Sequence, residues 1–185
     1  DYGVSNEDVD KVALNACTGV MPRLIGMHMK RVLGLDYADA VDLSNDPRFL
    51  TALVPAGNLI TTANDIARFY QCMVNGGELD GVRVFEQKTV RRAITPDGIG
   101  AGLDRTIGLP LRYSPGFMVG HRGVGLYGLN QHRTFGHLGL SSTITSAQPQ
   151  TDTVIAWITN GKPILGRHLT QMMGVLNGFN KIGRA

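Results

Sequence analysis

The chain has 185 residues, of which 43% are hydrophobic, which is enough for one domain with a buried core and too apolar for a disordered segment. The net charge is +3 and the basic residues are scattered, with Lys30-Arg31 and Arg91-Arg92 as the only adjacent pairs, whereas a nucleic-acid site needs a clustered basic face. No apolar run reaches the roughly 18 residues of a membrane span. Cys17 and Cys72 are too few for a disulfide framework, and we expect both to be small core residues.

The first periodic segment begins at Met21. Pro22 suits the first turn of a helix, where its missing N–H costs nothing, and Gly34 is a plausible end. The helical spacing places these side chains on one face: Leu24, Ile25, His28, Met29, Val32 and Leu33. The methionines of this segment allow two interpretations, core filling or a flexible wall of an acyl pocket.

Residues 36–60 look irregular, and a clear helix start follows them. Thr62 stands three residues before Asp65, an acidic variant of the capping box. We expect this helix to end at Gly76-Gly77, where glycine permits a left-handed cap. A second, short helix is predicted near Glu86–Ile94.

Beyond residue 96, short apolar runs separated by glycine and proline predict strands near 116–120, 124–129, 132–139, 141–148 and 153–159. The run at 153–159 is apolar on both faces, so helices should cover both sides of the sheet. The connections are too short for parallel crossovers. With a final helix over about 164–180, the predicted fold is α+β, a mainly antiparallel sheet flanked by helices on both faces.

Two motifs suggest a cofactor site, but neither has the neighbouring residues or elements that such a site requires. Gly123-Val-Gly125-Leu-Tyr-Gly128 matches G-x-G-x-x-G, but it leads toward another strand instead of a helix, so we interpret it as hairpin glycines. His132 and His137 have no cysteine or carboxylate at metal-ligand spacing around them. The sequence therefore predicts neither a dinucleotide nor a metal cofactor.

Glycines flank His137 in the segment Phe135-Gly136-His137-Leu138-Gly139-Leu140. Glycine inside a strand marks either a simple bend or the close approach of a ligand. A histidine there can donate or accept a proton near neutral pH. The segment by itself leaves both interpretations open.

Four segments in order resemble the serine β-lactamase-like superfamily. Residues 54–69 resemble its P-x-G-G-L-x-S-T-A-x-D-L-A-R-F segment, and residues 75–81 resemble the N-G-G-x-x-x-G that follows. Residues 135–139 are similar to F-G-H-x-G, the third active-site motif of the branch that holds class C β-lactamases, D-alanyl-D-alanine carboxypeptidases and related esterases. Residues 157–161 resemble the closing strand with its T-N.

The resemblance implies acyl transfer through a serine acyl-enzyme. His137 would contact the substrate or tune the catalytic network, Gly139 would let the strand approach the acyl group, and the N–H of Leu140 would be an oxyanion-hole donor. The family's S-x-x-K and Y-x-N motifs are missing here. No lysine follows three residues after any serine, namely Ser5, Ser44, Ser114, Ser141, Ser142 and Ser146.

Because the family places both missing motifs earlier, the resemblance implies that residues 1–185 are one region, the C-terminal portion of a hydrolase domain. Two features favour a carboxylesterase or lipase-type enzyme that acts on a small ester or amide: a pocket segment rich in Met and Leu, and H-x-G in place of K-T-G. Without its N-terminal portion, this chain should be inactive. A D-alanyl-D-alanine carboxypeptidase or class C-like β-lactamase is the nearest alternative, and a non-catalytic binding or scaffold domain is another. Unpaired sheet edges should then bind a companion fragment or a second copy.

Overall fold

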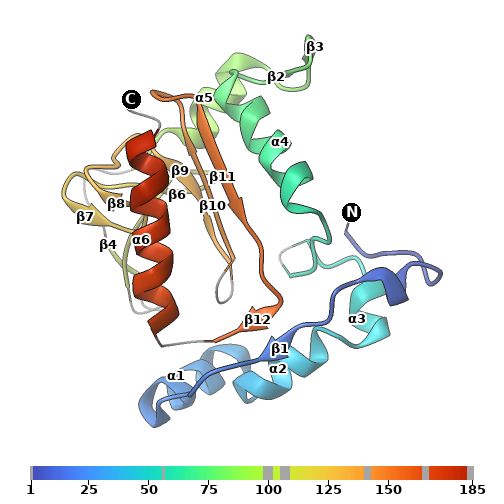
Figure 1. Ribbon diagram of the computed structural model, residues 1–185. Coiled ribbons are helices and arrows are strands. Elements are labelled where there is room, and N and C mark those ends of the chain that lie inside the picture. The colour runs from blue at the N-terminus through green and yellow to red at the C-terminus, as the bar shows by residue number, and fades with distance from the viewer. Residues whose placement is uncertain are drawn as a thin grey trace.

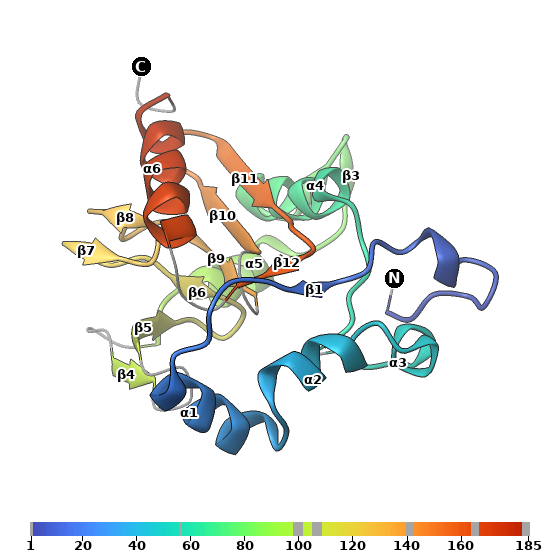
Figure 2. The same cartoon turned by 60° about the horizontal axis from the view of Figure 1, so that its bottom comes forward.

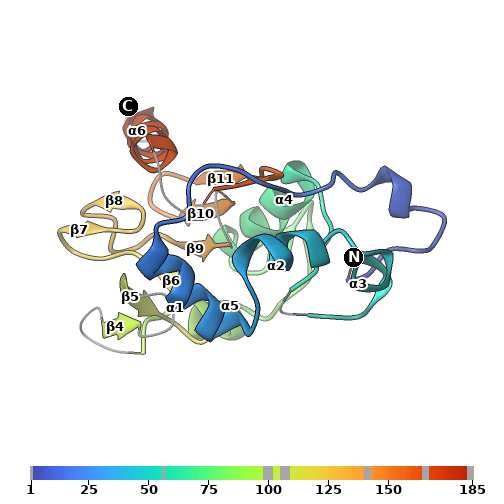
Figure 3. The ribbon, with the colours of Figure 1, turned by 90° about the horizontal axis from the view of Figure 1, so that it is seen from below.

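The computed structural model describes residues 2–55, 57–97, 102–104, 109–139, 143–163 and 167–182. Its centre is a six-stranded antiparallel sheet, which in spatial order consists of β11 (Thr153–Trp157), β10 (Ile144–Gln148), β9 (Phe135–Leu138), β6 (Met118–Val119), β5 (Leu109–Tyr113) and β4 (Gly102–Asp104). Helix α6 (Arg167–Ile182) lies over one face, and α4 (Ala63–Val74) and α5 (Gln87–Ile94) lie over the other (Figure 1). Seen from below, the three layers are separate (Figure 3).

Two hydrophobic cores lie on opposite faces of the sheet. The core beneath α4 and α5 consists of Tyr70, Met73, Val90, Phe117, Val119, Phe135 and Ala147. The core beneath α6 consists of Tyr127, Ile144, Ile155, Met172 and Leu176. Successive residues of a strand face opposite sides, so Ile144 and Ala147 of β10 enter different cores. The predicted α+β fold with helices on both faces is confirmed.

The start and end of α4 follow local rules. The Thr62 side chain accepts a hydrogen bond from the Asp65 N–H at 3.1 Å, and its hydroxyl donates to the Asp65 carboxylate at 2.7 Å. Gly76 and Gly77 have φ of 68° and 99°, the left-handed region that glycine tolerates. A Cβ at Gly77 would also lie 2.9 Å from the carbonyl carbon of Phe85. The predicted capping box and glycine end are confirmed.

The N-terminal third forms a separate group of short elements below the sheet. These are η1 (Val9–Lys11), β1 (Ala16–Cys17), α1 (Arg23–Leu33), α2 (Tyr37–Leu43) and α3 (Pro47–Thr51). Strand β1 pairs in parallel with β12 (Gly161–Lys162), as Figure 2 shows. Two small hairpins complete the fold, β2 (Glu78–Leu79) with β3 (Val82–Arg83), and β7 (Val124–Gly125) with β8 (Gly128–Leu129). The second confirms the hairpin interpretation of the G-x-G-x-x-G match, and it shows that the single strand predicted near 124–129 was wrong, because the chain turns back within it.

Several local predictions were wrong. Those for α1 and Cys17 were wrong because burial depends on distant segments. Helix α1 forms, but none of its residues is buried, and Leu24 is 81% exposed. Cys17 is exposed on β1, whereas Cys72 is buried as expected. The segment 36–60 contains α2 and α3, and the strand predicted over 132–139 begins only at Phe135, because residues 132–133 form a turn. No helix in the described ranges is long and apolar enough to cross a membrane.

Candidate active site

His137 lies near the end of β9, a central strand of the sheet. It stands opposite Thr145 of β10, and on the other side of β9 the neighbour of Gly136 is Met118 of β6. Phe135 and Gly136 are buried, while His137 is exposed. The strand therefore has one end inside the core and presents its histidine at the other end.

The two glycines that flank His137 and Leu138 differ in the space around them. A Cβ on Gly136 would lie 2.8 Å from Ser146 Cα and closer still to the carbonyl oxygen of Thr145, so the backbone of β10 excludes any side chain there. Among the described residues, a Cβ on Gly139 would meet Thr143, whose Cβ lies at 3.2 Å and whose carbonyl oxygen lies at 3.6 Å. Packing thus explains Gly136, whereas the described neighbours of Gly139 do not by themselves require a glycine. The Gly139 N–H donates to the Thr143 carbonyl at 2.9 Å, which closes the end of the strand pair.

Desolvation by surrounding protein atoms lowers the pKa of His137, and a main-chain hydrogen bond with Leu138 opposes this effect. The neutral imidazole is therefore favoured near pH 7. A neutral imidazole has one donor and one acceptor nitrogen. This side chain can therefore hydrogen-bond a substrate, but it supplies little positive charge.

A buried pair of hydroxyl groups lies behind His137. The Thr145 Oγ1 donates to the Tyr70 Oη of α4 at 2.7 Å, and the His137 N–H donates to the Thr145 Oγ1 at 3.2 Å. Burial raises the pKa of Tyr70. No local motif in the sequence marks this hydroxyl as a partner of β10, although a buried tyrosine hydroxyl usually needs a partner.

The remaining predicted site residue, Leu140, lies outside the described residues, as do Ser141 and Ser142. Ser114 is buried, and its hydroxyl donates to the Ala93 carbonyl at 2.5 Å and accepts from the Phe117 N–H at 3.0 Å. In the described ranges no serine is hydrogen-bonded to a lysine. The described part of the chain therefore contains no serine activated by a lysine.

Two of the motif-like segments serve the fold. Asn58, from the segment 54–69, is buried; its carboxamide accepts from the Val54 N–H at 3.1 Å and donates to the carbonyls of Phe49 and Ala52 at 2.7 and 2.6 Å. Asn160, from the segment 157–161, donates to the carbonyl of Leu14 at 3.1 Å. The first fixes the loop before α4, and the second attaches the N-terminal segment to β12.

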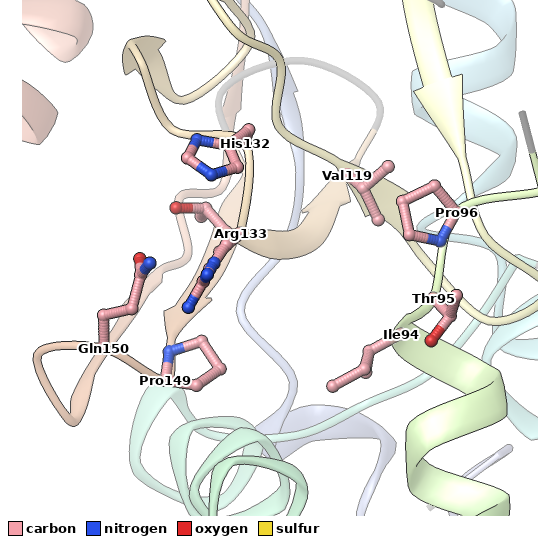
Figure 4. Close-up of a pocket in the computed structure, with 9 residues that line it drawn as sticks. Ile94, Thr95, Pro96, Val119, His132, Arg133, Pro149 and Gln150 are labelled. Atoms are coloured by element: carbon pink, nitrogen blue, oxygen red, sulfur yellow. The ribbon is translucent and has the colours of Figure 1, made fainter. Parts of the chain in front are cut away.

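A pocket of about 460 Å³ lies at the opposite end of β9 from Gly139 (Figure 4). On one side of the pocket lie His132, Arg133 and Gln150, which face apolar side chains on the other side. None of the predicted site residues lines this pocket. Its full lining is Ile94, Thr95, Pro96, Val119, His132, Arg133, Thr134, Pro149 and Gln150. No cluster of three or more potential metal ligands occurs among the described residues.

The chain is similar to known proteins in sequence and in structure. The chain is 33% identical over 117 residues, 60% of its length, to the esterase/β-lactamase LipL of Mycobacterium tuberculosis, of which it covers 24%. It resembles the solved structure of EstA from Arthrobacter nitroguajacolicus Rue61a with a TM-score of 0.64, 20% identity, and coverage of 96% of this chain and 50% of that one.

A family VIII carboxylesterase structure gives a TM-score of 0.58 at 24% identity, covering 74% of this chain and 36% of that one. The chain therefore spans half the length of these proteins or less. The family model described as Beta-lactamase matches residues 13–171, most of the chain. Together with the two-faced antiparallel sheet and the H-x-G strand, this match establishes that the chain belongs to the β-lactamase family of hydrolases, the serine β-lactamase- and transpeptidase-like proteins.

Proposed function

We propose that the intact protein is a serine hydrolase that cleaves carboxylic esters through an acyl-enzyme, and that residues 1–185 form the C-terminal portion of its catalytic domain. In this proposal His137 and Gly139 line the acyl site, and the N–H of Leu140 is one oxyanion-hole donor. The nucleophilic serine and its lysine and tyrosine partners belong to the N-terminal portion. This chain alone is then inactive.

The observation that carries the ester preference is the exposed, predominantly neutral histidine at the end of β9. A β-lactam or peptide substrate carries a carboxylate that a cation binds well, and a neutral imidazole is a weak partner for it. An ester without a carboxylate makes no such demand. The name of the family VIII carboxylesterase supports the same choice, and the name of LipL includes an esterase.

We also propose that the outer edge of β11 binds a strand of the missing portion. Strand β11 ends the described sheet on that side, so its outward N–H and C=O groups have no neighbouring strand among the described residues. Such an edge is a template for another strand. A companion fragment added to this chain should form a stoichiometric complex in gel filtration, while a self-association that persists in the intact protein would contradict the proposal.

The experiment is to assay the intact protein with p-nitrophenyl esters of several acyl lengths beside the β-lactam nitrocefin. We expect ester hydrolysis in the intact protein and none with residues 1–185 alone. Hydrolysis of nitrocefin without any ester would favour a β-lactamase, the class that the name of LipL also contains. Hydrolysis of neither, with no S-x-x-K in the preceding reading frame, would favour a binding or scaffold domain.

A further inference from the structure

Tyr70 and Thr145 form an isolated polar pair inside the core between α4 and the sheet. The two residues are 4% and 6% exposed, and the Thr145 Oγ1 and Tyr70 Oη lie 2.7 Å apart. The Tyr70 ring packs against Phe117 and Phe135, with centroid distances of 5.6 and 6.1 Å. These rings fix the direction in which the phenol group points.

The Thr145 hydroxyl contacts the main chain of His137 on both sides. It accepts from the His137 N–H at 3.2 Å, and it lies 3.4 Å from the His137 carbonyl oxygen, to which it can also donate. Hydroxyl hydrogens rotate, so two arrangements are open. Either Thr145 donates to Tyr70, or Tyr70 donates to Thr145 and Thr145 donates to His137. In both arrangements the hydroxyl pair is hydrogen-bonded to the His137 peptide.

This contact adds to the strand pairing of His137 with Thr145 near the end of β9. Gly136 and Gly139 lie on either side of His137, and glycine restricts the chain less than any other residue. Strand β9 ends at Leu138, and the hydrogen bond from the Gly139 N–H to the Thr143 carbonyl follows directly after it. A buried hydroxyl that is left without a partner is unfavourable, so the pair holds the peptide in one position.

We propose that Tyr70 and Thr145 are a positioning pair for the site strand: through the His137 main chain they set the direction of the His137 imidazole. The inference rests on the proposed function, in which His137 lines the acyl site. The two hydroxyls touch neither substrate nor imidazole, so they act only through the placement of that residue. A displaced catalytic wall lowers turnover more than it weakens substrate binding.

The test compares Thr145→Val, Thr145→Ser and Tyr70→Phe in the intact protein, with Thr153→Val of β11 as the matched control. The Thr153 hydroxyl donates to the Thr151 carbonyl at 3.0 Å, and Thr153 pairs with Gln148, at the other end of β10 from Ile144. Two readouts are taken, kcat and KM for a p-nitrophenyl ester and the NMR resonances of the His137 imidazole. We expect Thr145→Val to lower kcat about tenfold with little change in KM, and to shift the His137 resonances.

Thr145→Ser keeps the hydroxyl and should restore kcat and the resonances, while Thr153→Val should change neither. Tyr70→Phe should fall in between, because Thr145 can still donate to the His137 carbonyl; it retains the packed ring and serves if Thr145→Val does not fold. Unchanged His137 resonances in Thr145→Val would overturn the inference, and Tyr70→Phe decides in the same way if Thr145→Val does not fold. A Thr145→Ser variant that is as defective as Thr145→Val would also overturn it. If the wild-type protein hydrolyses no ester, the proposed function fails, and the resonances alone then decide the positioning role.

Discussion

Substituting the two glycines of the site strand should separate folding from catalysis. In Gly136→Ala, the new Cβ lies 2.8 Å from Ser146 Cα, while carbon atoms in contact prefer about 3.5–4.0 Å. The strands must therefore separate by most of an ångström, and overpacking of this kind costs about 1–3 kcal/mol. For a protein of this size, each kcal/mol lowers Tm by about 2–4 °C. We expect a Tm that is lower by about 2–12 °C.

Gly139→Ala should behave differently, because among the described residues its Cβ meets the Thr143 Cβ at 3.2 Å, a milder contact than the one at Gly136. The free energy of unfolding should change by about 0.5 kcal/mol or less. Gly139→Val adds bulk toward the proposed acyl site and should lower kcat about 10²-fold or more, the scale of losing an oxyanion donor. Thermal unfolding by circular dichroism and p-nitrophenyl ester hydrolysis by the intact protein measure the two effects. Wild-type turnover in Gly139→Val would remove this residue from the site, and an unchanged Tm in Gly136→Ala would refute the packing argument.

Three further predictions concern the start of α4, the loop that Asn58 fixes before it, and His137. Thr62→Ala removes the α4 cap and should lower the free energy of urea unfolding by about 1 kcal/mol, whereas Thr61→Ala, one residue earlier, should cost less. Asn58→Ala removes the donor to two partly buried carbonyl oxygens and should cost about 1–3 kcal/mol, against almost nothing for the exposed Asn64→Ala. Equal losses in the two variants would contradict the role of Asn58 in fixing the loop before α4. Because the pKa of His137 lies below its ordinary value of about 6.5, the neutral imidazole persists to lower pH. Activity that needs the neutral imidazole should therefore fall only as the pH drops below about 6.5. In His137→Asn this fall in activity at acid pH should be absent. An NMR titration midpoint of the imidazole above that value would contradict this prediction.

Local chemistry in the sequence was sufficient to identify α4 and the H-x-G strand. Capping at Thr62 and the left-handed glycines after α4 involve atoms only a few residues apart, so their pattern is visible in the chain itself. The same holds for the hairpin glycines at 123–128, where the lack of a following helix excluded a dinucleotide loop. The family resemblance and the α+β class followed from ordered segments of this kind.

Helix α1 marks the limit of such reasoning. Its period predicts an apolar face, and the helix forms, yet its side chains are not buried, because burial requires a second surface that the pattern of one helix does not specify. The strand containing Leu109–Tyr113 was missed for a related reason, since Pro110 argues against a strand while pairing with β4 and β6 stabilises one at this place.

The sequence by itself determined that a histidine between glycines lies in a strand, and left open whether the glycines serve packing or a ligand. The tertiary structure decided this for Gly136, which the backbone of β10 requires, and it showed that the described neighbours of Gly139 do not by themselves require a glycine. It also brought Tyr70 to Thr145, 75 residues away, and placed Thr145 opposite His137. The physical reason is that strand register and helix docking are set by contacts between distant segments, which no local pattern of residue types specifies.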